Sequence, residues 1–112
     1  MGDNMIPLLK FNKMYYQMIV DGVKTQTIRK SNKRFGTGET VKAIFPGTDL
    51  EITVIITDAG YKQFKYIDDE DAEREGYSSA QELKEALLEI YPRLDNFDRV
   101  YYYRFEVADS DA

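Results

Sequence analysis

The residues best suited to chemistry lie together in the segment 22–30, which is rich in cationic, hydroxyl and amide side chains. A lysine that is partly removed from water has a lowered pKa and can accept a proton from a hydroxyl. Lys24 can therefore activate Thr27 as a nucleophile, and Arg29 can hold a carboxylate, a phosphate or a carbonyl oxygen. The alternative is a solvated edge strand in which threonine serves only β propensity.

The chain of 112 residues contains neither histidine nor cysteine, and this absence limits its chemistry. It excludes a Ser-His-Asp triad, thiolate nucleophiles, disulfides and zinc sites built on these residues. We therefore expect no metal and no cofactor. Any reaction has to depend on carboxylate, lysine, arginine or hydroxyl side chains.

Charge is unevenly distributed along the chain. Twenty acidic and fifteen basic residues give a net charge of -5, which argues against a protein that binds duplex DNA by neutralising phosphates. Between residues 24 and 42, however, six charged residues are basic and one is acidic, a net charge of +5 that leaves -10 for the remainder. Lys30, Lys33 and Arg34 are either plain surface or contacts for an anionic ligand such as an RNA backbone.

The chain shows no repeat and no linker, which predicts one domain over residues 1–112 with flexible ends at 1–4 and 109–112. It has no apolar run of about 18 residues and no basic-then-apolar leader. We therefore expect a cytoplasmic protein with no membrane contact. The sequence leaves the oligomeric state open, with a monomer as the default.

Hydrophobic periodicity predicts a mixture of helices and strands. An apolar stripe at helical spacing indicates a helix over residues 11–19, with Asn12 capping its start and Gly22 closing it. Strands are predicted at 25–29, 41–45, 50–57 and 100–107. Further helices are predicted at 68–75 and from Ser78 or Ser79 to residue 91, with Gln81 or Glu82 as the capping partner. This grouping favours an α+β architecture, a small curved sheet or partial barrel of mixed or antiparallel strands with helices covering its open ends.

Two expectations concern side chains within these elements. Met14 and Met18 are predicted to fill the core at helical spacing. The last strand is predicted to have one apolar side. That side carries Tyr101, Tyr103, Phe105 and Val107.

The pattern G-x-K-x-x-T-x-R, formed by Gly22, Lys24, Thr27 and Arg29, resembles the signature of the ASCH domain, a small PUA-like fold associated with RNA. The likeness extends to the preceding helix, the turn at residues 37–39 and the two later helices, so it covers roughly residues 8–107. It implies a mixed or antiparallel PUA-like β-barrel of about five strands flanked by about three helices.

The small single-domain members of this family are similar to amidohydrolases that convert N4-acetylcytidine to cytidine and acetate. The resemblance implies that Thr27 is the nucleophile and Lys24 its base, and that Glu75 is a second acid or base or a carboxylate that organises the oxyanion site. Arg29 would orient the substrate or brace the site. Two further positions border the implied pocket and bear on base or acyl specificity. They are Gln26, where an aliphatic residue is usual, and Lys30, where an acidic or polar one is usual.

Other interpretations remain open. The same basic cleft, with Arg29, Gln26, Lys30, Lys33 and Arg34, also suits a non-catalytic module that binds RNA. A protein-interaction domain whose site residues have lapsed is a third possibility. Glu75 lies in an acidic run that can simply be a solvated helix face. Tyr61 and Tyr102 are candidates for stacking on a base.

Overall fold

The computed structural model describes residues 5–108, so the expected flexible ends at 1–4 and 109–112 lie outside the described residues. These residues form five strands, three α-helices and two short 3-10 helices, η1 and η2. In chain order these are β1 (Leu8–Lys10), η1 (Lys13–Tyr15), α1 (Tyr16–Val20), β2 (Gln26–Arg29), β3 (Thr40–Ile44), β4 (Glu51–Gln63), η2 (Phe64–Tyr66), α2 (Asp69–Arg74), α3 (Ala80–Ile90) and β5 (Arg99–Val107).

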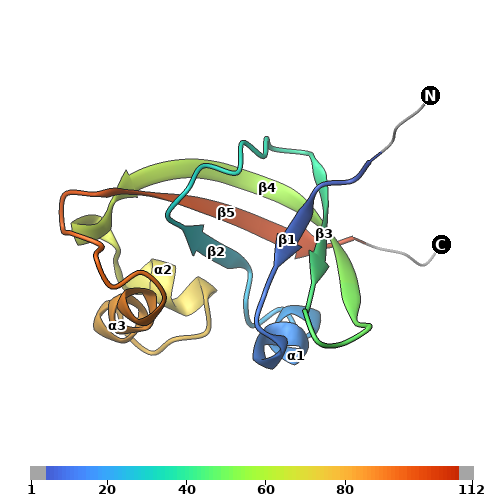
Figure 1. Cartoon of the computed structure of the whole chain (residues 1–112), viewed down its shortest axis with the longest axis horizontal. Helices are drawn as coiled ribbons and strands as arrows, with labels where there is room; N and C mark the ends of the chain where they lie inside the picture. The colour runs from blue at the N-terminus through green and yellow to red at the C-terminus, as the bar shows by residue number, and fades with distance from the viewer. Residues whose placement is uncertain (1–4, 109–112) are drawn as a thin grey trace.

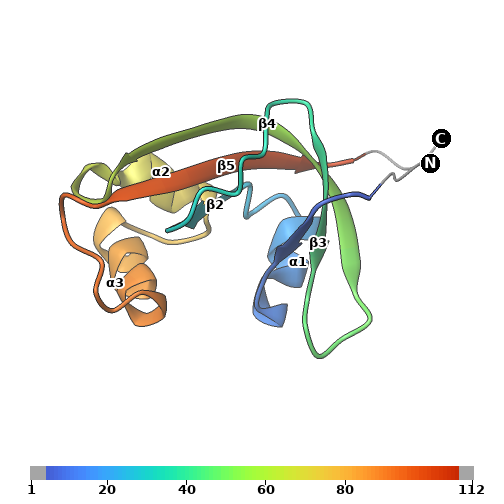
Figure 2. The same cartoon turned by 45° about the horizontal axis from the view of Figure 1, so that its top comes forward.

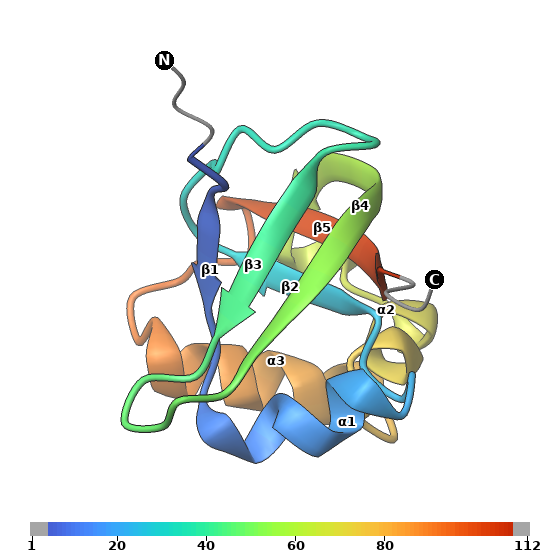
Figure 3. The ribbon, with the colours of Figure 1, turned by 90° about the vertical axis from the view of Figure 1, so that its right-hand side faces the viewer.

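The five strands form one sheet in the order β1-β3-β4-β5-β2. Strand β1 runs parallel to β3, and the other neighbouring pairs are antiparallel. The sheet curls into a half-barrel because β4 and β5 are long and bent, with a register shift between Ile56 and Asp58 (Figures 1 and 3). The predicted α+β architecture with a curved, partly closed sheet is confirmed.

The helices cover the two ends of the curl. Helix α1 lies near β1 and β3, and helices α2 and α3 lie together below the far part of β4 and β5 (Figures 1 and 2). Helix α3 begins after Ser79, whose hydroxyl accepts from the Glu82 backbone N–H, as its capping pattern predicts. Helix α2 begins with a capping box between Asp68 and Asp71.

At the N-terminal side the structure has one strand that was not predicted and one helix that differs from its prediction. Strand β1 was not recognised because its three residues are too few for a pattern and only Leu9 is buried. The first helix starts as the 3-10 turn η1 with Asn12 as its cap, and only Tyr16–Val20 is α-helical. Met14 is 66% exposed, so its predicted place in the core is wrong. Gly22 does close the helix with a φ of +73°.

The core consists of two clusters that share strand β5. The first lies inside the curl and contains Leu9, Phe11, Ile19, Val41, Ala43, Phe45, Ile52, Val54, Ile56, Tyr103 and Phe105. The second lies against α2 and α3 and contains Ile28, Phe64, Ile67, Ala72, Leu83, Leu87, Leu94 and Val100. The prediction of one apolar side for β5 is therefore wrong, because Val100 is fully buried on the other side. Strand β5 links the two clusters.

No helix within residues 5–108 is long and apolar enough to cross a membrane.

Candidate active site

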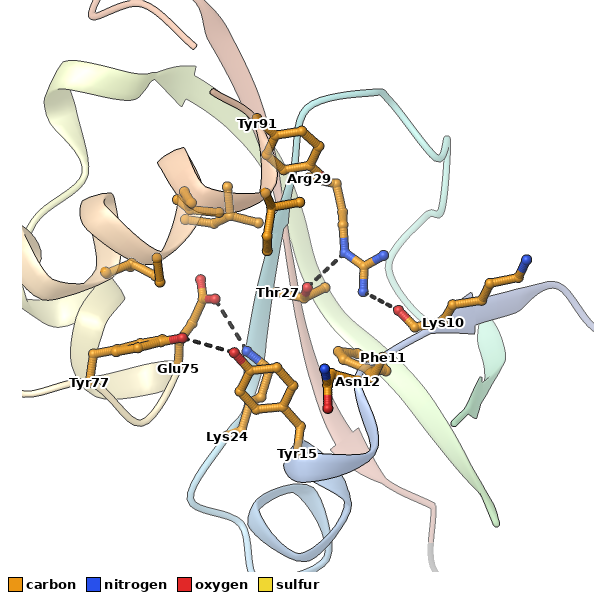
Figure 4. A pocket seen from close by; sticks show the side chains of 15 residues that line it. Lys10, Phe11, Asn12, Tyr15, Lys24, Thr27, Arg29, Glu75, Tyr77 and Tyr91 are labelled. Atoms are coloured by element: carbon orange, nitrogen blue, oxygen red, sulfur yellow. Dashed lines mark hydrogen bonds and ion pairs between the residues drawn. The ribbon is translucent and has the colours of Figure 1, made fainter. Parts of the chain in front are cut away.

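A cavity lies at the seam of the half-barrel, between the two edge strands β1 and β2. Its volume is about 210 Å³, and helix α3 and the 3-10 turn η1 complete its walls (Figure 4). The Arg29 side chain spans the seam, because its Nη2 donates to the Lys10 carbonyl oxygen at 2.8 Å. The lining residues are Lys10, Phe11, Asn12, Tyr15, Lys24, Thr27, Ile28, Arg29, Glu75, Tyr77, Leu83, Ala86, Leu87, Ile90 and Tyr91.

Lys24 and Glu75 form a buried ion pair at this cavity. Backbone hydrogen bonds bring them together: the Lys24 N–H donates to the Met18 carbonyl, and the Thr25 N–H donates to the Arg74 carbonyl at 2.7 Å. The segment before β2 is thereby fixed against the C-terminal end of α2. Lys24 Nζ lies 3.3 Å from Glu75 Oε1, and both side chains are 4% exposed.

Burial acts on the two members of this pair in opposite senses. Desolvation lowers the pKa of Lys24 and raises the pKa of Glu75, because a charge is disfavoured away from water. Their mutual attraction works against both shifts without cancelling them. The two pKa values therefore move toward each other. Such a pair can share one proton and leave the lysine amine neutral.

Thr27 lines the same cavity and is bonded to a different partner. Its Oγ1 accepts a hydrogen bond from Arg29 Nε at 2.9 Å, and the residue is 4% exposed. Within residues 5–108 no hydrogen bond joins Thr27 to Lys24. The cavity thus holds two pairs, Lys24 with Glu75 and Thr27 with Arg29. Because Thr27 Oγ1 is the acceptor in this hydrogen bond, the hydroxyl proton of Thr27 stays available for removal. The positive guanidinium also favours negative charge on Oγ1.

Two tyrosines that the sequence reasoning missed form part of the wall. The hydroxyls of Tyr15 and Tyr77 lie 2.8 Å apart, and Lys24 Nζ lies 4.7 Å from the centre of the Tyr15 ring (Figure 4). Burial and the contact with Tyr15 raise the pKa of Tyr77. Tyr77 therefore stays protonated at neutral pH, and the tyrosine pair can donate one hydroxyl to a ligand. No spacing signal connects these residues, which are 62 positions apart.

The predicted binding residues other than Arg29 lie outside the cavity wall. Gln26 is fully buried behind it, on the opposite side of β2 from Thr27. Lys30, Lys33 and Arg34 are exposed on the loop between β2 and β3. Their roles in binding stay predictions.

Asp71 is a second residue that the sequence reasoning missed. It is fully buried and accepts hydrogen bonds from Gln26 and Lys62. The signal was available, because Asp71 and Glu75 are four residues apart and so share one face of α2 with the apolar Ala72 beside them. Within residues 5–108, no group of three or more His, Cys, Asp or Glu side chains is placed to hold a metal ion.

Two hollows of opposite charge flank the cavity. One shares Lys10, Phe11 and Asn12 with it and adds Lys13. The other lies along α3. It includes Glu82, Glu85 and Glu89. We expect the more negative part of a ligand to lie toward Lys10 and Lys13.

Comparison with solved structures identifies relatives of this fold. An ASCH domain from Lactobacillus crispatus JV V101 superposes with a TM-score of 0.76 at 13% identity, covering 90% of this chain and 79% of its own. Protein EF3133 from Enterococcus faecalis V583 superposes with a TM-score of 0.73 at 15% identity, covering 96% and 78%. A mutant of ZmASCH from Zymomonas mobilis superposes with a TM-score of 0.65 at 11% identity, covering 88% of this chain and 67% of its own. The chain therefore has an ASCH-like, PUA-like fold.

Neither the protein-family models nor the curated proteins give a match to this sequence.

Proposed function

We propose that this protein is an amidohydrolase that hydrolyses the amide of N4-acetylcytidine to cytidine and acetate. The observation that carries the proposal is the buried Lys24–Glu75 pair, which opens onto the same small cavity as the Thr27 hydroxyl. Amide hydrolysis needs a nucleophile, a base near neutral pKa and a proton for the departing nitrogen. These three residues supply all of them without a metal.

In the proposed first step the neutral Lys24 amine removes the Thr27 hydroxyl proton, while Thr27 Oγ1 forms a bond to the acetyl carbon. Arg29, which already donates to this oxygen, stabilises its developing charge. The bond between the acetyl carbon and N4 then breaks, and the Lys24 ammonium gives its proton to N4. Cytidine leaves, and the acetyl group remains on Thr27 as an ester.

In the second step water attacks this ester. One proton of the water passes through Lys24 to the Thr27 oxygen as the ester bond breaks. The acetic acid formed gives its remaining proton to solvent and departs as acetate. Glu75 holds Lys24 in place at 3.3 Å and keeps the proton that the pair shares, so the amine is neutral again once it has passed its extra proton to the Thr27 oxygen. Substrate binding has to bring Lys24 and Thr27 within reach of each other, since catalytic hydrogen bonds are often completed only in the complex.

The size and walls of the cavity support a small, planar substrate. Its volume of about 210 Å³ lies below the roughly 300–1,000 Å³ of sites for drug-sized ligands. Phe11, Tyr15, Tyr77 and Tyr91 supply aromatic walls for a nucleobase with a short acyl group. The convergence of the three chemical side chains on this cavity speaks against an interaction domain with a lapsed site.

The test is hydrolysis of N4-acetylcytidine by the purified protein, followed through acetate release. We expect turnover by the wild type and by Thr25→Val, and turnover at least about 100-fold lower in Thr27→Val. Thr25 is a matched control because it lies two residues away and does not line the cavity. Equal turnover in the two variants would exclude Thr27 as the nucleophile.

A second candidate function is RNA binding, and a row of side chains on the sheet favours it. Arg29, Tyr101 and Tyr61 are cross-strand neighbours on β2, β5 and β4, and therefore share a face of the sheet. Tyr61 is 60% exposed, and the Arg99 guanidinium lies 4.1 Å from the centre of its ring. Exposed aromatic rings beside cations suit single-stranded RNA.

RNA binding predicts an affinity that falls as salt rises and falls again when Lys30, Lys33 and Arg34 are replaced together by glutamine. An RNA affinity that changes neither with salt nor in the triple variant would exclude this function. The Lys30, Lys33, Arg34 triple variant should hydrolyse free N4-acetylcytidine normally, because these residues are outside the cavity wall. The single-domain organisation and the cytoplasmic location expected from the sequence stay predictions.

A further inference from the structure

Gln26 is a fully buried polar side chain next to the cavity, and the reaction described above does not use it. It is 0% exposed and begins β2. Its register partner on β5 is Arg104, whereas the partner of Thr27 is Tyr103, so the two side chains leave β2 on opposite faces. Gln26 therefore reaches Glu75 from behind and does not meet a ligand in the cavity.

The Gln26 amide makes three hydrogen bonds that fix its orientation. Its Nε2 donates to Glu75 Oε2 at 3.2 Å and to Asp71 Oδ1 at 3.1 Å, and its Oε1 accepts from Arg104 Nε at 3.0 Å. An ionised carboxylate only accepts and a guanidinium only donates, so the amide fits this place in one orientation. A neutral donor thereby separates two buried carboxylates.

Both oxygens of Glu75 consequently have donors on different sides. Oε1 faces Lys24 and Oε2 faces Gln26. Asp71 behind the amide is itself held by Lys62 Nζ at 2.7 Å and by the Asp68 backbone N–H at 3.0 Å. The carboxylate plane of Glu75 is thus set by a chain of contacts that starts in α2 and β5 and ends at the catalytic lysine.

We propose that Gln26 is a positioning residue of this site: its amide keeps Glu75 apart from Asp71 and holds the Glu75 carboxylate with one oxygen toward Lys24. A role for Gln26 in catalysis rests on the proposed function. Its effect on the Glu75 carboxylate rests on the geometry alone. Gln26 would then adjust the protonation of the Lys24–Glu75 pair and would not bind the substrate directly.

The surroundings of Glu75 determine in which direction its pKa moves when Gln26 is replaced. The hydrogen bond from Gln26 favours the charged form of Glu75 and lowers its pKa, whereas the nearby charge of Asp71 raises it. Removing the Gln26 amide therefore raises the pKa of Glu75 further. The titratable and charged groups that face Glu75 come from six parts of the chain. They are Lys24 before β2, Arg29 in β2, Asp71 in α2, Tyr77 after α2, its partner Tyr15 in η1, and Arg104 in β5 through Gln26.

The experiment is a carbon-13 NMR titration of the Glu75 side-chain carboxyl in the wild type, in Gln26→Met and in Gln63→Met. Methionine has nearly the shape of glutamine and donates no hydrogen bond. Gln63 is the matched control, because its amide contacts only the Phe97 carbonyl among the described residues. The titration needs no substrate, so its outcome is separate from whether the protein hydrolyses N4-acetylcytidine.

We expect the Glu75 midpoint to rise by about one pH unit or more in Gln26→Met and to stay in place in Gln63→Met. If hydrolysis is observed, the acid limb of its pH profile should move upward by a similar amount in Gln26→Met. An unchanged Glu75 midpoint in Gln26→Met would overturn the proposal.

If Gln26→Met does not fold, as judged by circular dichroism, Gln26→Asn takes its place. Its amide is one methylene shorter and cannot reach both carboxylates. The same rise in the Glu75 midpoint is expected there, and an unchanged midpoint again overturns the proposal. A loss of hydrolysis with normal Glu75 titration would count against the proposed function alone.

Discussion

Two lysine–carboxylate pairs lie at opposite ends of one hydrogen-bonded network, and they differ in what burial does to them. Lys24 and Glu75 are both 4% exposed and 3.3 Å apart, whereas Lys62 is 22% exposed and its Nζ lies 2.7 Å from Asp71 Oδ2. Burial dominates the first pair and moves its two pKa values toward each other. In the second, hydrogen bonds outweigh burial and lower the pKa of Asp71.

The difference shows how one chain uses the same residue types for two purposes. Lys62 keeps contact with water and stabilises Asp71, which completes the capping box of α2 and anchors Gln26. Lys24 has lost this contact, so its ammonium is poorly solvated and can give up a proton. The Lys62–Asp71 pair favours stability, and the Lys24–Glu75 pair suits chemistry.

The largest expected effect comes from replacing Lys24. In Lys24→Met we expect hydrolysis of N4-acetylcytidine to fall by about 1,000-fold, because this variant lacks the base that we propose activates Thr27. The free energy of unfolding should change little, since the raised pKa of Glu75 lets this carboxyl take up a proton once its partner is absent. Acetate release and urea unfolding measure the two quantities on the same preparation.

The second expected effect is the reverse of the first. Lys62→Met leaves the buried Asp71 carboxylate without its cation and should lower the free energy of unfolding by about 2 kcal/mol. Hydrolysis should fall far less than in Lys24→Met, because Lys62 does not line the cavity. If the two variants lost activity and stability in equal proportion, the contrast between the pairs would be wrong.

The smallest expected effect is a difference in pH dependence between two neutral replacements. The folded pKa of Asp71 is lowered, so its stabilisation is present above the ordinary aspartate value of about 3.9 and is lost as the pH falls through the folded pKa. The stability advantage of the wild type over Asp71→Asn should therefore shrink on acidification.

Glu75 should show the opposite slope. Its folded pKa is raised, so its contribution is fully present below the ordinary glutamate value of about 4.3 and is lost as the pH rises through the folded pKa. The wild type should therefore gain stability relative to Glu75→Gln on acidification. Urea unfolding at several pH values checks both signs, and parallel slopes for the two variants would contradict the assignment.

Much of the fold could be predicted from the sequence, because its longer elements carry clear periodic patterns. The α3 helix, strands β3 and β5 and the first part of β4 follow from apolar spacing and capping residues, whereas the continuation of β4 to Gln63 was not predicted. Strand β1 could not be recognised, since its three residues form only by pairing with β3. Helix α1 is shorter than its apolar stripe because the chain enters it through a 3-10 turn.

The site could be predicted only in part. Lys24, Thr27 and Arg29 are close in sequence, so spacing alone suggested their cooperation. Glu75 was reached through a resemblance, because nothing in the chain shows that α2 ends against the segment before β2. The contacts of Gln26 and Asp71 depend on how α2 docks on the sheet, and 45 residues separate them.

The most direct test of the central claim is the hydrolysis of N4-acetylcytidine by three folded proteins: the wild type, Lys24→Met and Lys42→Met. Lys42 is the control because its pair with Glu51 is partly exposed and lies outside the cavity wall. The account predicts acetate release by the wild type and by Lys42→Met, and almost none by Lys24→Met. No release by the wild type, or equal release by all three, would contradict it.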